Sequence, residues 1–439
     1  MDARLPTLES IRAAATRLDG DDGDHDALLA MAADRDFVLL GEASHGTREF
    51  YQMRAAITRR LLDEAGFDAI AVEGDWPDVQ RLNRYVLGGD SDDLDGAFGD
   101  FERFPAWLWR NTEMRDFVAW LRARNDRVGA DVAAGLYGMD LYSLYRSAEA
   151  VIGYLTPRDP QQAAAARRLY QGLDHVQEAQ EYGYEAAIGL RPDCQDDAVR
   201  LLYGLQQSAP RFEAREGRAA RELQFLAERN ASVVVNAERY YRNMFVGRTN
   251  TWNLRDGHMV DTLVALRAHL QREGRTGRIV VWAHNSHLGD ARATAMGERG
   301  ELNVGQLLRQ RLGAERVLLV GFTTHTGHVT AARRWDGPPE RRWVRPSRPD
   351  SWERQFHLSG LDRFFLPLGA GVGGEKRLER AIGVLYLPES ERGSHYFPAD
   401  LPAQFDALYH LDETDALEPL EPGQHWEPRE GPDTWPTGL

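Results

Sequence analysis

Short apolar runs, each followed directly by polar residues, recur along the chain. These runs lie at residues 37–40, 69–72, 132–137, 279–283, 317–322 and 381–387. Continuous apolar runs of this length are typical of strands that are buried on both faces of a parallel sheet. Helical patterns lie between several of the runs. The sequence therefore predicts an α/β fold with a mostly parallel central sheet that is flanked by helices.

The segment between the first two runs has the spacing of a helix with one apolar face. Its apolar positions, three or four residues apart, are Phe50, Met53, Ile57 and Leu61. Thr47 is placed to cap the start of this helix, and Gly66 is placed to end it. Residues 113–125 and 256–270 have the same helical spacing. Strand, helix and strand then form the repeating unit of an α/β core.

No strand pattern appears between residues 141 and 250, where residues that favour helices predominate. We predict that 141–250 is a large helical insertion that walls or covers a site. Residues 1–140 and 251–397 are then the two parts of the α/β core. Residues 398–439 are rich in proline and acidic residues, which predicts a C-terminal tail on the surface.

Acidic residues outnumber basic ones by 68 to 53, for a formal net charge of −15, in a chain of 439 residues. This excess argues against a groove for nucleic acid, which needs clustered positive charge. No apolar stretch approaches the length of a membrane helix, and the N-terminus lacks the apolar segment of a secretory signal. We expect a cytoplasmic protein with no membrane partner. The sequence leaves the oligomeric state open.

Two residue types are nearly absent, and each absence removes a chemistry. Cys194 is the single cysteine, so the chain has no intrachain disulfide and no zinc site built from several thiolates. Lys376 is the single lysine. It lies in a glycine-rich loop without the strand-to-helix turn that phosphate binding requires. We expect no cofactor.

The predicted strand ends carry titratable side chains that would meet at one edge of a parallel sheet, where ligands bind in such folds. They are Glu42, His45, Glu73, Asp75, Asp140, His284, His287 and His325. Each could instead cap a helix or contact solvent. Because the same choice recurs at five strand ends, a catalytic or binding site is the better interpretation.

The loop after the first strand, residues 41–46, places His45 next to a helix start. Histidine suits general-base catalysis because its ordinary pKa lies near neutral pH. Glu42 or Glu73 could hold the imidazole and stabilise its cation. The spacing of a serine nucleophile elbow is absent, since Gly41 precedes Ser44 by three residues.

Two other interpretations of these residues stay open. His45, His284 and His287, together with the two glutamates, could form the ligand set of a metal-dependent hydrolase. The chain could also be a small-molecule binding protein, such as a heme-binding one with a histidine at a strand end. Turnover of an ester would distinguish an enzyme from a binding protein.

Candidate substrate-binding residues combine aromatic and polar side chains near the predicted site, although clustered aromatic residues often pack in a core instead. These candidates are Trp76, Trp107, Trp109, Arg110, Asn111, Asp140 and His325.

Several of these motifs, in this order, resemble those of the erythromycin esterase family. The similar stretches are residues 41–50 (GEASHGTREF), 69–76 (AIAVEGDW), 104–111 (FPAWLWRN), 282–290 (WAHNSHLGD), 303–307 (NVGQL), 321–327 (GFTTHTG) and 391–397 (ERGSHYF). The resemblance implies an α/β hydrolase with a deep cleft, formed with the helical insertion, that opens ester or lactone bonds without a covalent intermediate. Macrolides are among the substrates to test, and we expect the enzyme to act without a metal.

The resemblance also implies roles for individual residues. His45 corresponds to the base that activates water. The other catalytic positions of the family fall on Glu42, Glu73, Arg54, His284 and His287. We expect Glu42 and Glu73 to orient His45, and His284, His287 or Arg54 to stabilise the developing oxyanion. The partner is then a small-molecule ester or lactone.

Overall fold

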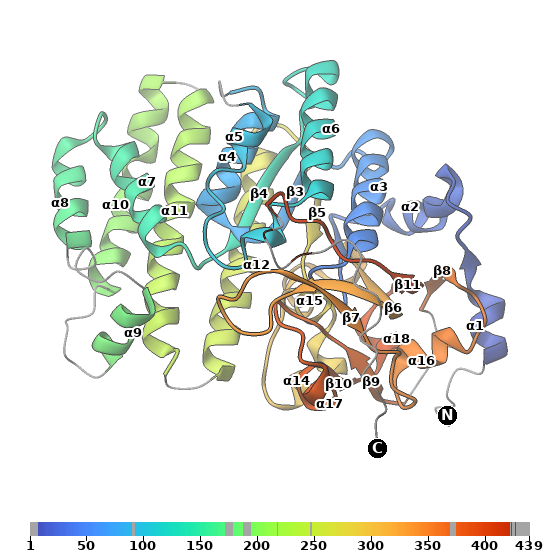
Figure 1. Ribbon diagram of the computed structural model, residues 1–439. Helices are drawn as coiled ribbons and strands as arrows, with labels where there is room; N and C mark the ends of the chain where they lie inside the picture. The colour runs from blue at the N-terminus through green and yellow to red at the C-terminus, as the bar shows by residue number, and fades with distance from the viewer. Residues whose placement is uncertain are drawn as a thin grey trace. The chain divides into compact units, whose positions relative to one another are not determined.

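The computed structural model describes residues 8–89, 93–171, 179–187, 195–216, 218–245, 248–368, 375–421, 423 and 426. The chain divides into two compact units. The first comprises Met1–Ala71, Leu82–Gly135 and Thr276–Leu439, and the second comprises Val72–Arg81 and Leu136–Arg275. Figure 1 labels most of the helices and strands of both.

The central sheet contains nine strands of the described chain, in the order β1-β8-β11-β6-β2-β5-β3-β4, with β7 paired to β6. The bounds are β1 Thr16–Arg17, β2 Phe37–Leu40, β3 Ala69–Asp75, β4 Gly135–Asp140, β5 Ile279–Trp282, β6 Val317–Ala331, β7 Glu340–Val344, β8 Arg363–Pro367 and β11 Ala407–Thr414. Strand β2 is parallel to both β5 and β6. Its four residues are completely buried, as the continuous apolar run predicts. The predicted α/β class with a mostly parallel central sheet is confirmed.

One predicted strand is wrong. Residues 381–387 form no ladder; Ile382 makes an isolated bridge to Ser44 and Leu385 makes one to Ala332. The adjacent residues form a separate two-stranded sheet from β9 (Arg377–Arg380) and β10 (Tyr396–Ala399). Ile382 and Tyr386 of this run are buried in a cluster with Val329, Ala331 and Val344 of β6 and β7, so their apolar character reflects packing and not strand pairing.

Strand β11 lies within the residues assigned from sequence to the acidic tail. It pairs parallel to β6 and antiparallel to β8, and its residues Ala407–Leu411 are buried. This part of the predicted tail is sheet core. At its end, Gly327 of β6 has a φ of +131°, and a Cβ there would lie 1.9 Å from the Thr414 carbonyl oxygen.

Helices of the first unit lie between these strands. Their bounds are α1 Leu8–Ala14, α2 Asp26–Ala32, α3 Arg48–Glu64, α5 Leu94–Ala97, α6 Thr112–Val128, α13 Asn285–Leu288, α14 Ala295–Glu298, α15 Val304–Leu312, α16 Trp352–His357, α17 Glu391–Ser394 and α18 Leu401–Gln404. Helix α3 buries Phe50, Ile57 and Leu61, as its spacing predicts. Thr47 is its N-cap residue by position, but its side chain makes no capping hydrogen bond.

The second unit is helical beyond its strand residues. Its helices are α7 Leu144–Leu155, α8 Pro160–Gln171, α9 Ala179–Ala187, α10 Gln195–Glu216, α11 Arg218–Asn243 and α12 Arg248–Arg272, while α4 (Trp76–Val86) belongs partly to each unit. Helix α11 lies beside both α7 and α10 (Figure 1). Within the described chain, no helix combines the length and the apolar character that crossing a membrane requires.

Replacement of Gly327 by alanine tests the pairing of β6 with β11. The new methyl group would meet the Thr414 carbonyl, and a side chain is also strained at positive φ. We expect Gly327→Ala to lower the free energy of unfolding by about 2 kcal/mol or more, measured by urea denaturation. Gly393→Ala is the control, because its Cβ would have nothing within 4 Å. Equal stabilities of the two variants would contradict the assignment of β11 to the sheet.

Candidate active site

The loop between β2 and α3 places Glu42 and His45 against α13. Gly41 is required at its start because a Cβ there would lie 2.1 Å from the Asn285 side-chain oxygen. The amide of Asn285 then donates a hydrogen bond to the Glu42 carbonyl over 2.8 Å. These contacts bring the two histidine-bearing loops of the first unit together.

His45 is held by a carboxylate within its own loop. Its Nδ1 lies 2.9 Å from Oε1 of Glu42, and the His45 residue is 8% exposed. Because an ionised carboxylate only accepts hydrogen bonds, Nδ1 carries the proton and donates. The other nitrogen, Nε2, then has the free lone pair that a general base needs.

Arg54 from α3 binds the other oxygen of the same carboxylate. Its Nη2 donates to Oε2 of Glu42 over 2.7 Å, and Arg54 is completely buried. The guanidinium carbon lies 4.3 Å from the ring centroid of Tyr51 and 5.1 Å from that of Trp282. Both rings favour the cation at this position. Glu42 therefore has one oxygen on Arg54 and one on His45.

His284, the residue before α13, lies beside His45, with 4.8 Å between the ring centroids. Its Nδ1 is 2.8 Å from Oγ of Ser286 and also accepts from the Ser286 amide. Its Nε2 lies 3.3 Å from the Ala43 carbonyl oxygen, so Nε2 carries the proton. His287 is buried within α13.

Ser44 forms its side-chain hydrogen bond with Thr47. Its Oγ shares a short hydrogen bond with Oγ1 of Thr47, and the residue is 1% exposed. The described contacts thus pair His45 with Glu42 and Ser44 with Thr47.

A second cluster of arginine and carboxylates lies in the second unit, at the ends of β3 and β4. Arg255 of α12 donates from Nη2 to Glu73 and to Asp140, over 2.6 Å in each case. Its Nε also contacts both oxygens of Asp140. The guanidinium lies over the ring of Tyr142 at 4.9 Å. One partly buried cation therefore contacts both predicted site carboxylates.

The electrostatics of Arg255 follow from this arrangement. Burial alone would lower its pKa, but the charge of Asp140 leads the opposing effects and raises the pKa well above its ordinary value. Burial raises the pKa of Tyr142 well above its usual range. The Arg255 cation is thus permanent at any pH of interest. Arg255 was not identified from the sequence, because nothing in the sequence distinguishes this helix arginine from one that faces solvent.

The predicted aromatic residues are packed inside the protein. Trp107 and Trp109 are each 5% exposed, and the Trp109 ring packs edge-on against Tyr51 at 6.1 Å. Trp76 of the second unit is 2% exposed and stacks on Tyr137 at 6.0 Å.

Arg110 and Asn111 have local structural partners. Arg110 donates to the Phe98 carbonyl and pairs with Glu421. Asn111 caps α6, because its side-chain oxygen accepts from the Met114 amide over 2.7 Å.

His325 on β6 contacts other partners than those of His45. Its Nδ1 lies 2.5 Å from Oγ of Ser347, and its ring stacks on His357 at 3.8 Å. His357 in turn contacts the Asp412 carboxylate. Burial, with the neighbouring His357 charge, lowers the pKa of His325 to about 4. It is therefore a neutral ring at physiological pH.

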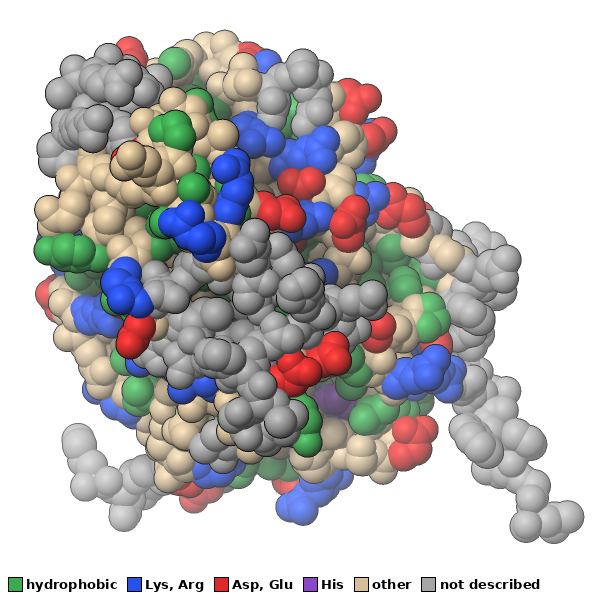
Figure 2. Space-filling view, turned by 90° about the vertical axis from the view of Figure 1, so that its left-hand side faces the viewer, with side chains coloured by type: hydrophobic (Ala, Val, Ile, Leu, Met, Phe, Trp, Pro, Cys, Tyr) green, Lys and Arg blue, Asp and Glu red, His purple; other side chains and the backbone are tan. Residues whose placement is uncertain are grey.

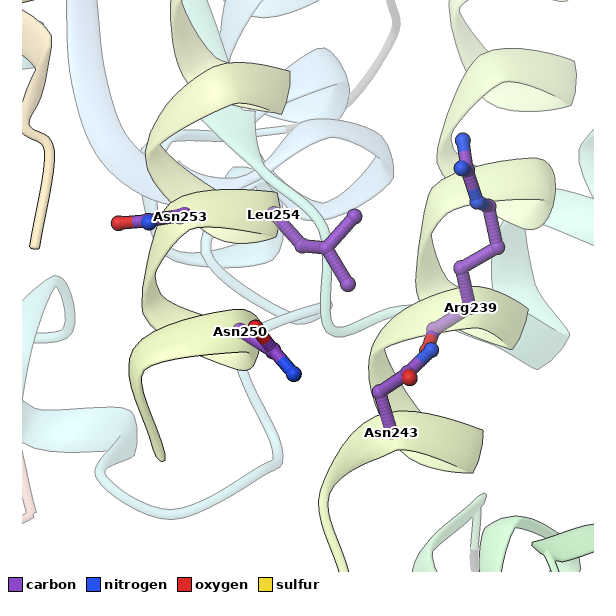
Figure 3. A pocket seen from close by; sticks show the side chains of 5 residues that line it. All are labelled: Arg239, Asn243, Asn250, Asn253 and Leu254. Atoms are coloured by element: carbon purple, nitrogen blue, oxygen red, sulfur yellow. The ribbon is translucent and has the colours of Figure 1, made fainter. Parts of the chain in front are cut away.

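A cavity of about 340 Å³ lies in the second unit between α11 and α12. It is lined by Arg239, Asn243, Asn250, Asn253 and Leu254. Figure 3 shows Asn250 and Leu254 of α12 on the side that faces Arg239 and Asn243 of α11. Amide and guanidinium groups of this kind suit hydroxyl or carboxylate substituents of a ligand.

No metal cluster is seen in the described part of the protein, and no broad charged patch is seen on the face that Figure 2 shows. Within the described ranges, no group of three or more histidine, cysteine, aspartate or glutamate side chains has the arrangement to hold a metal ion. On the face shown in Figure 2, basic and acidic side chains lie beside one another and do not form a broad patch of one sign.

Comparison with known proteins decides the family. The model of the erythromycin esterase family matches residues 62–414. This chain belongs to the erythromycin esterase family. The predicted membership is confirmed, and Glu73, Asp140, His284, His287 and His325 lie within the matched range. Glu42, His45 and Arg54 precede it.

A named erythromycin esterase is similar to this chain over most of its length. The chain is 23% identical to the erythromycin esterase type II of Escherichia coli over 415 residues, which covers 90% of this chain and 93% of that protein.

Solved structures share the fold. A protein described as a succinoglycan biosynthesis protein has a TM-score of 0.75 at 21% identity, covering 94% of this chain and 97% of its own. A Bacillus cereus protein has a TM-score of 0.75 at 18% identity, with 94% and 98% covered. A mutant of the erythromycin esterase EreC, in an open conformation, has a TM-score of 0.67 at 18% identity, with the same coverage.

Removal of the Arg255 charge tests the second cluster. Arg255→Met would remove the cation that contacts the buried carboxylates of Glu73 and Asp140, and we expect a loss of about 3 to 5 kcal/mol in the free energy of unfolding, measured in urea. Arg221 makes a more exposed pair with Glu273 at 2.7 Å, so Arg221→Met is the control and should cost at most about 1 kcal/mol. Similar losses for both variants would contradict the special role of Arg255.

Proposed function

We propose that this protein hydrolyses a carboxylic ester or lactone, with His45 as the general base that activates water. The observation that carries the proposal is the contact chain from Arg54 through Glu42 to Nδ1 of His45. It leaves Nε2 as the basic atom and supplies a carboxylate for the cation that forms when Nε2 gains a proton. Membership of the erythromycin esterase family supports ester hydrolysis as the reaction.

The reaction then has two proton transfers. Nε2 of His45 takes a proton from water while the water oxygen bonds to the ester carbonyl carbon and the carbonyl electrons move to oxygen. When the tetrahedral intermediate breaks down, the imidazolium returns the proton to the leaving alkoxide. Glu42 stabilises the imidazolium between the two steps.

The contacts suggest different roles for the other predicted catalytic residues. Arg54 is completely buried and already bound to Glu42, so we assign it to orientation of Glu42. His284 is the better candidate for oxyanion stabilisation, because its ring lies 4.8 Å from that of His45. Its Nε2 proton, which the Ala43 carbonyl accepts over 3.3 Å, would be donated to the substrate oxygen instead. Glu73, held by Arg255, retains the orienting role that the family resemblance implies, and His287 retains its catalytic assignment on the same ground.

The proposed substrate class is a small-molecule ester or lactone. The name of the Escherichia coli relative makes macrolides the first substrates to assay. Asp140, His325, Trp76, Trp107, Trp109, Arg110 and Asn111 remain proposed substrate-binding residues. A panel of macrolides, simple lactones and activated esters would identify the class.

Replacement of His45 tests the base directly. We expect His45→Asn to lower kcat by about 10²- to 10⁴-fold, because the variant cannot take a proton from water. Ser44→Ala is the matched control, since Ser44 contacts Thr47 instead. It should stay within about tenfold of the wild type. A folded His45→Asn protein with wild-type kcat, or a covalent adduct on Ser44 trapped with a slow ester, would refute the proposed mechanism.

Chelation separates the proposed mechanism from a metal-dependent one. We expect full activity after exhaustive treatment with EDTA, because His45 acts through a proton and Glu42 through hydrogen bonds. Elemental analysis of the active protein should then find no stoichiometric metal. Loss of activity on chelation, with recovery on addition of one divalent ion, would favour the metal-dependent alternative.

A further inference from the structure

Asn285 connects the two histidine loops of the first unit to the sheet. Besides its backbone bond to Glu42, its side-chain Nδ2 donates to the Phe322 carbonyl over 2.9 Å. Its Oδ1 accepts from the Phe322 amide over 3.3 Å. Asn285 is completely buried and directly follows His284. The orientation of one amide therefore sets where the His284 loop lies against the Glu42 loop.

Glu379 of β9 provides a further acceptor for the same amide. Its Oε1 lies 3.3 Å from Nδ2 of Asn285, and Glu379 is completely buried. Its Oε2 is buried without a hydrogen-bond partner among the described residues. A buried carboxyl with one unpaired oxygen is costly as an anion.

The described groups that act on Glu379 are one acid and two neutral amides. Glu353 of α16 is the charged residue that acts on it, and Asn285 of α13 and Gln404 of α18 present neutral amides. Glu353 is itself completely buried, and it accepts a hydrogen bond from the Arg380 amide over 2.7 Å. Two acids thus share an interior region. The charge of the buried Arg380 acts on Glu353, whereas no cation among the described residues acts on Glu379.

We propose that Glu379 is a positioning residue for the active site: as a neutral acid it fixes Asn285, and through Asn285 the backbone that carries Glu42 and His284. The catalytic part of this proposal rests on the proposed function. Ionisation of Glu379 would place two carboxylates in one buried region. Their repulsion would displace Glu379 and its contact with Asn285.

The ionisation behaviour of Glu379 agrees with this geometry. Burial first, and then the charge of Glu353, raises the pKa of Glu379 from 4.5 to about 8, although the amides of Gln404 and Asn285 oppose the change. A raised pKa in the folded state means that the neutral form's contribution to stability is complete below pH 4.5. This contribution is lost as the pH rises towards 8.

Thermal unfolding of Glu379→Gln across pH tests the neutral state without any substrate. Glutamine keeps the acceptor for Asn285 and cannot ionise. We expect the difference in Tm, variant minus wild type, to increase between about pH 5 and about pH 8 and then to level off. Glu391→Gln is the control, because Glu391 is also buried but lies near Arg380 and Tyr386. A difference for Glu379→Gln that is flat with pH would overturn the proposal.

A second experiment tests positioning. Glu379→Leu removes the acceptor, so we expect kcat to fall at least tenfold with little change in KM, and Glu379→Gln to restore it. The ratio of Glu379→Gln to wild-type kcat should increase about tenfold between about pH 7 and about pH 9.

Histidine ring signals in NMR spectra give a readout that needs no turnover. Signals of His45 and His284 should shift in Glu379→Leu and stay in place in Glu391→Gln. If wild-type protein hydrolyses no ester, the proposed function fails while these spectra still decide whether Glu379 positions the loops. Unchanged His45 and His284 signals in a folded Glu379→Leu variant would overturn the positioning role. If that variant does not fold, the pH dependence of Tm in Glu379→Gln decides whether the proposal holds.

Discussion

The buried ion pair between Arg54 and Glu42 is the interaction on which the candidate active site depends. Removal of either charge would leave the other in the protein interior, which costs far more than loss of a surface pair. Arg54 is fixed by the rings of Tyr51 and Trp282, which belong to the core of the first unit. The direction of the His45 imidazole is therefore set by core packing and not by a flexible loop.

The second unit uses the same physical solution. There a single arginine from α12 balances Glu73 and Asp140 at the ends of two strands. Carboxylates can stay ionised away from water only when a cation or several hydrogen bonds compensate for the lost hydration. Glu379 is the opposite case, because no cation among the described residues acts on it and burial raises the pKa of its carboxyl.

The parts of the fold that follow from burial on both faces could be predicted from sequence. Residues 37–40 and the run from 279 are apolar because β2 and β5 lie inside the sheet and the side chains on both of their faces are buried. Strand β11 escaped prediction because its apolar residues are followed by acids and lie close to prolines. Residues 381–387 are equally apolar but pair only at isolated positions. A short apolar run reports burial, whereas strand pairing depends on partners far away in sequence.

The candidate site was predictable in part for the same reason. The positions of Glu42 and His45 after a strand indicated chemistry, but the choice of Glu42 over Glu73 as the partner of Nδ1 depends on side-chain geometry. Arg255 and Glu379 have no local sequence signal, since an arginine on a helix and a glutamate on a short strand usually face solvent. Only the packing of distant segments shows that Glu379 is buried and that Arg255 contacts two buried carboxylates.

The tautomer of His45 tests the central claim most directly. In ¹⁵N-labelled protein, the His45 ring signals can be assigned as those that disappear in His45→Asn. With Glu42 accepting from Nδ1, the neutral ring should carry its proton on Nδ1 and leave Nε2 bare. A neutral His45 ring with its proton on Nε2 would contradict the account, because no basic nitrogen would then be available to water.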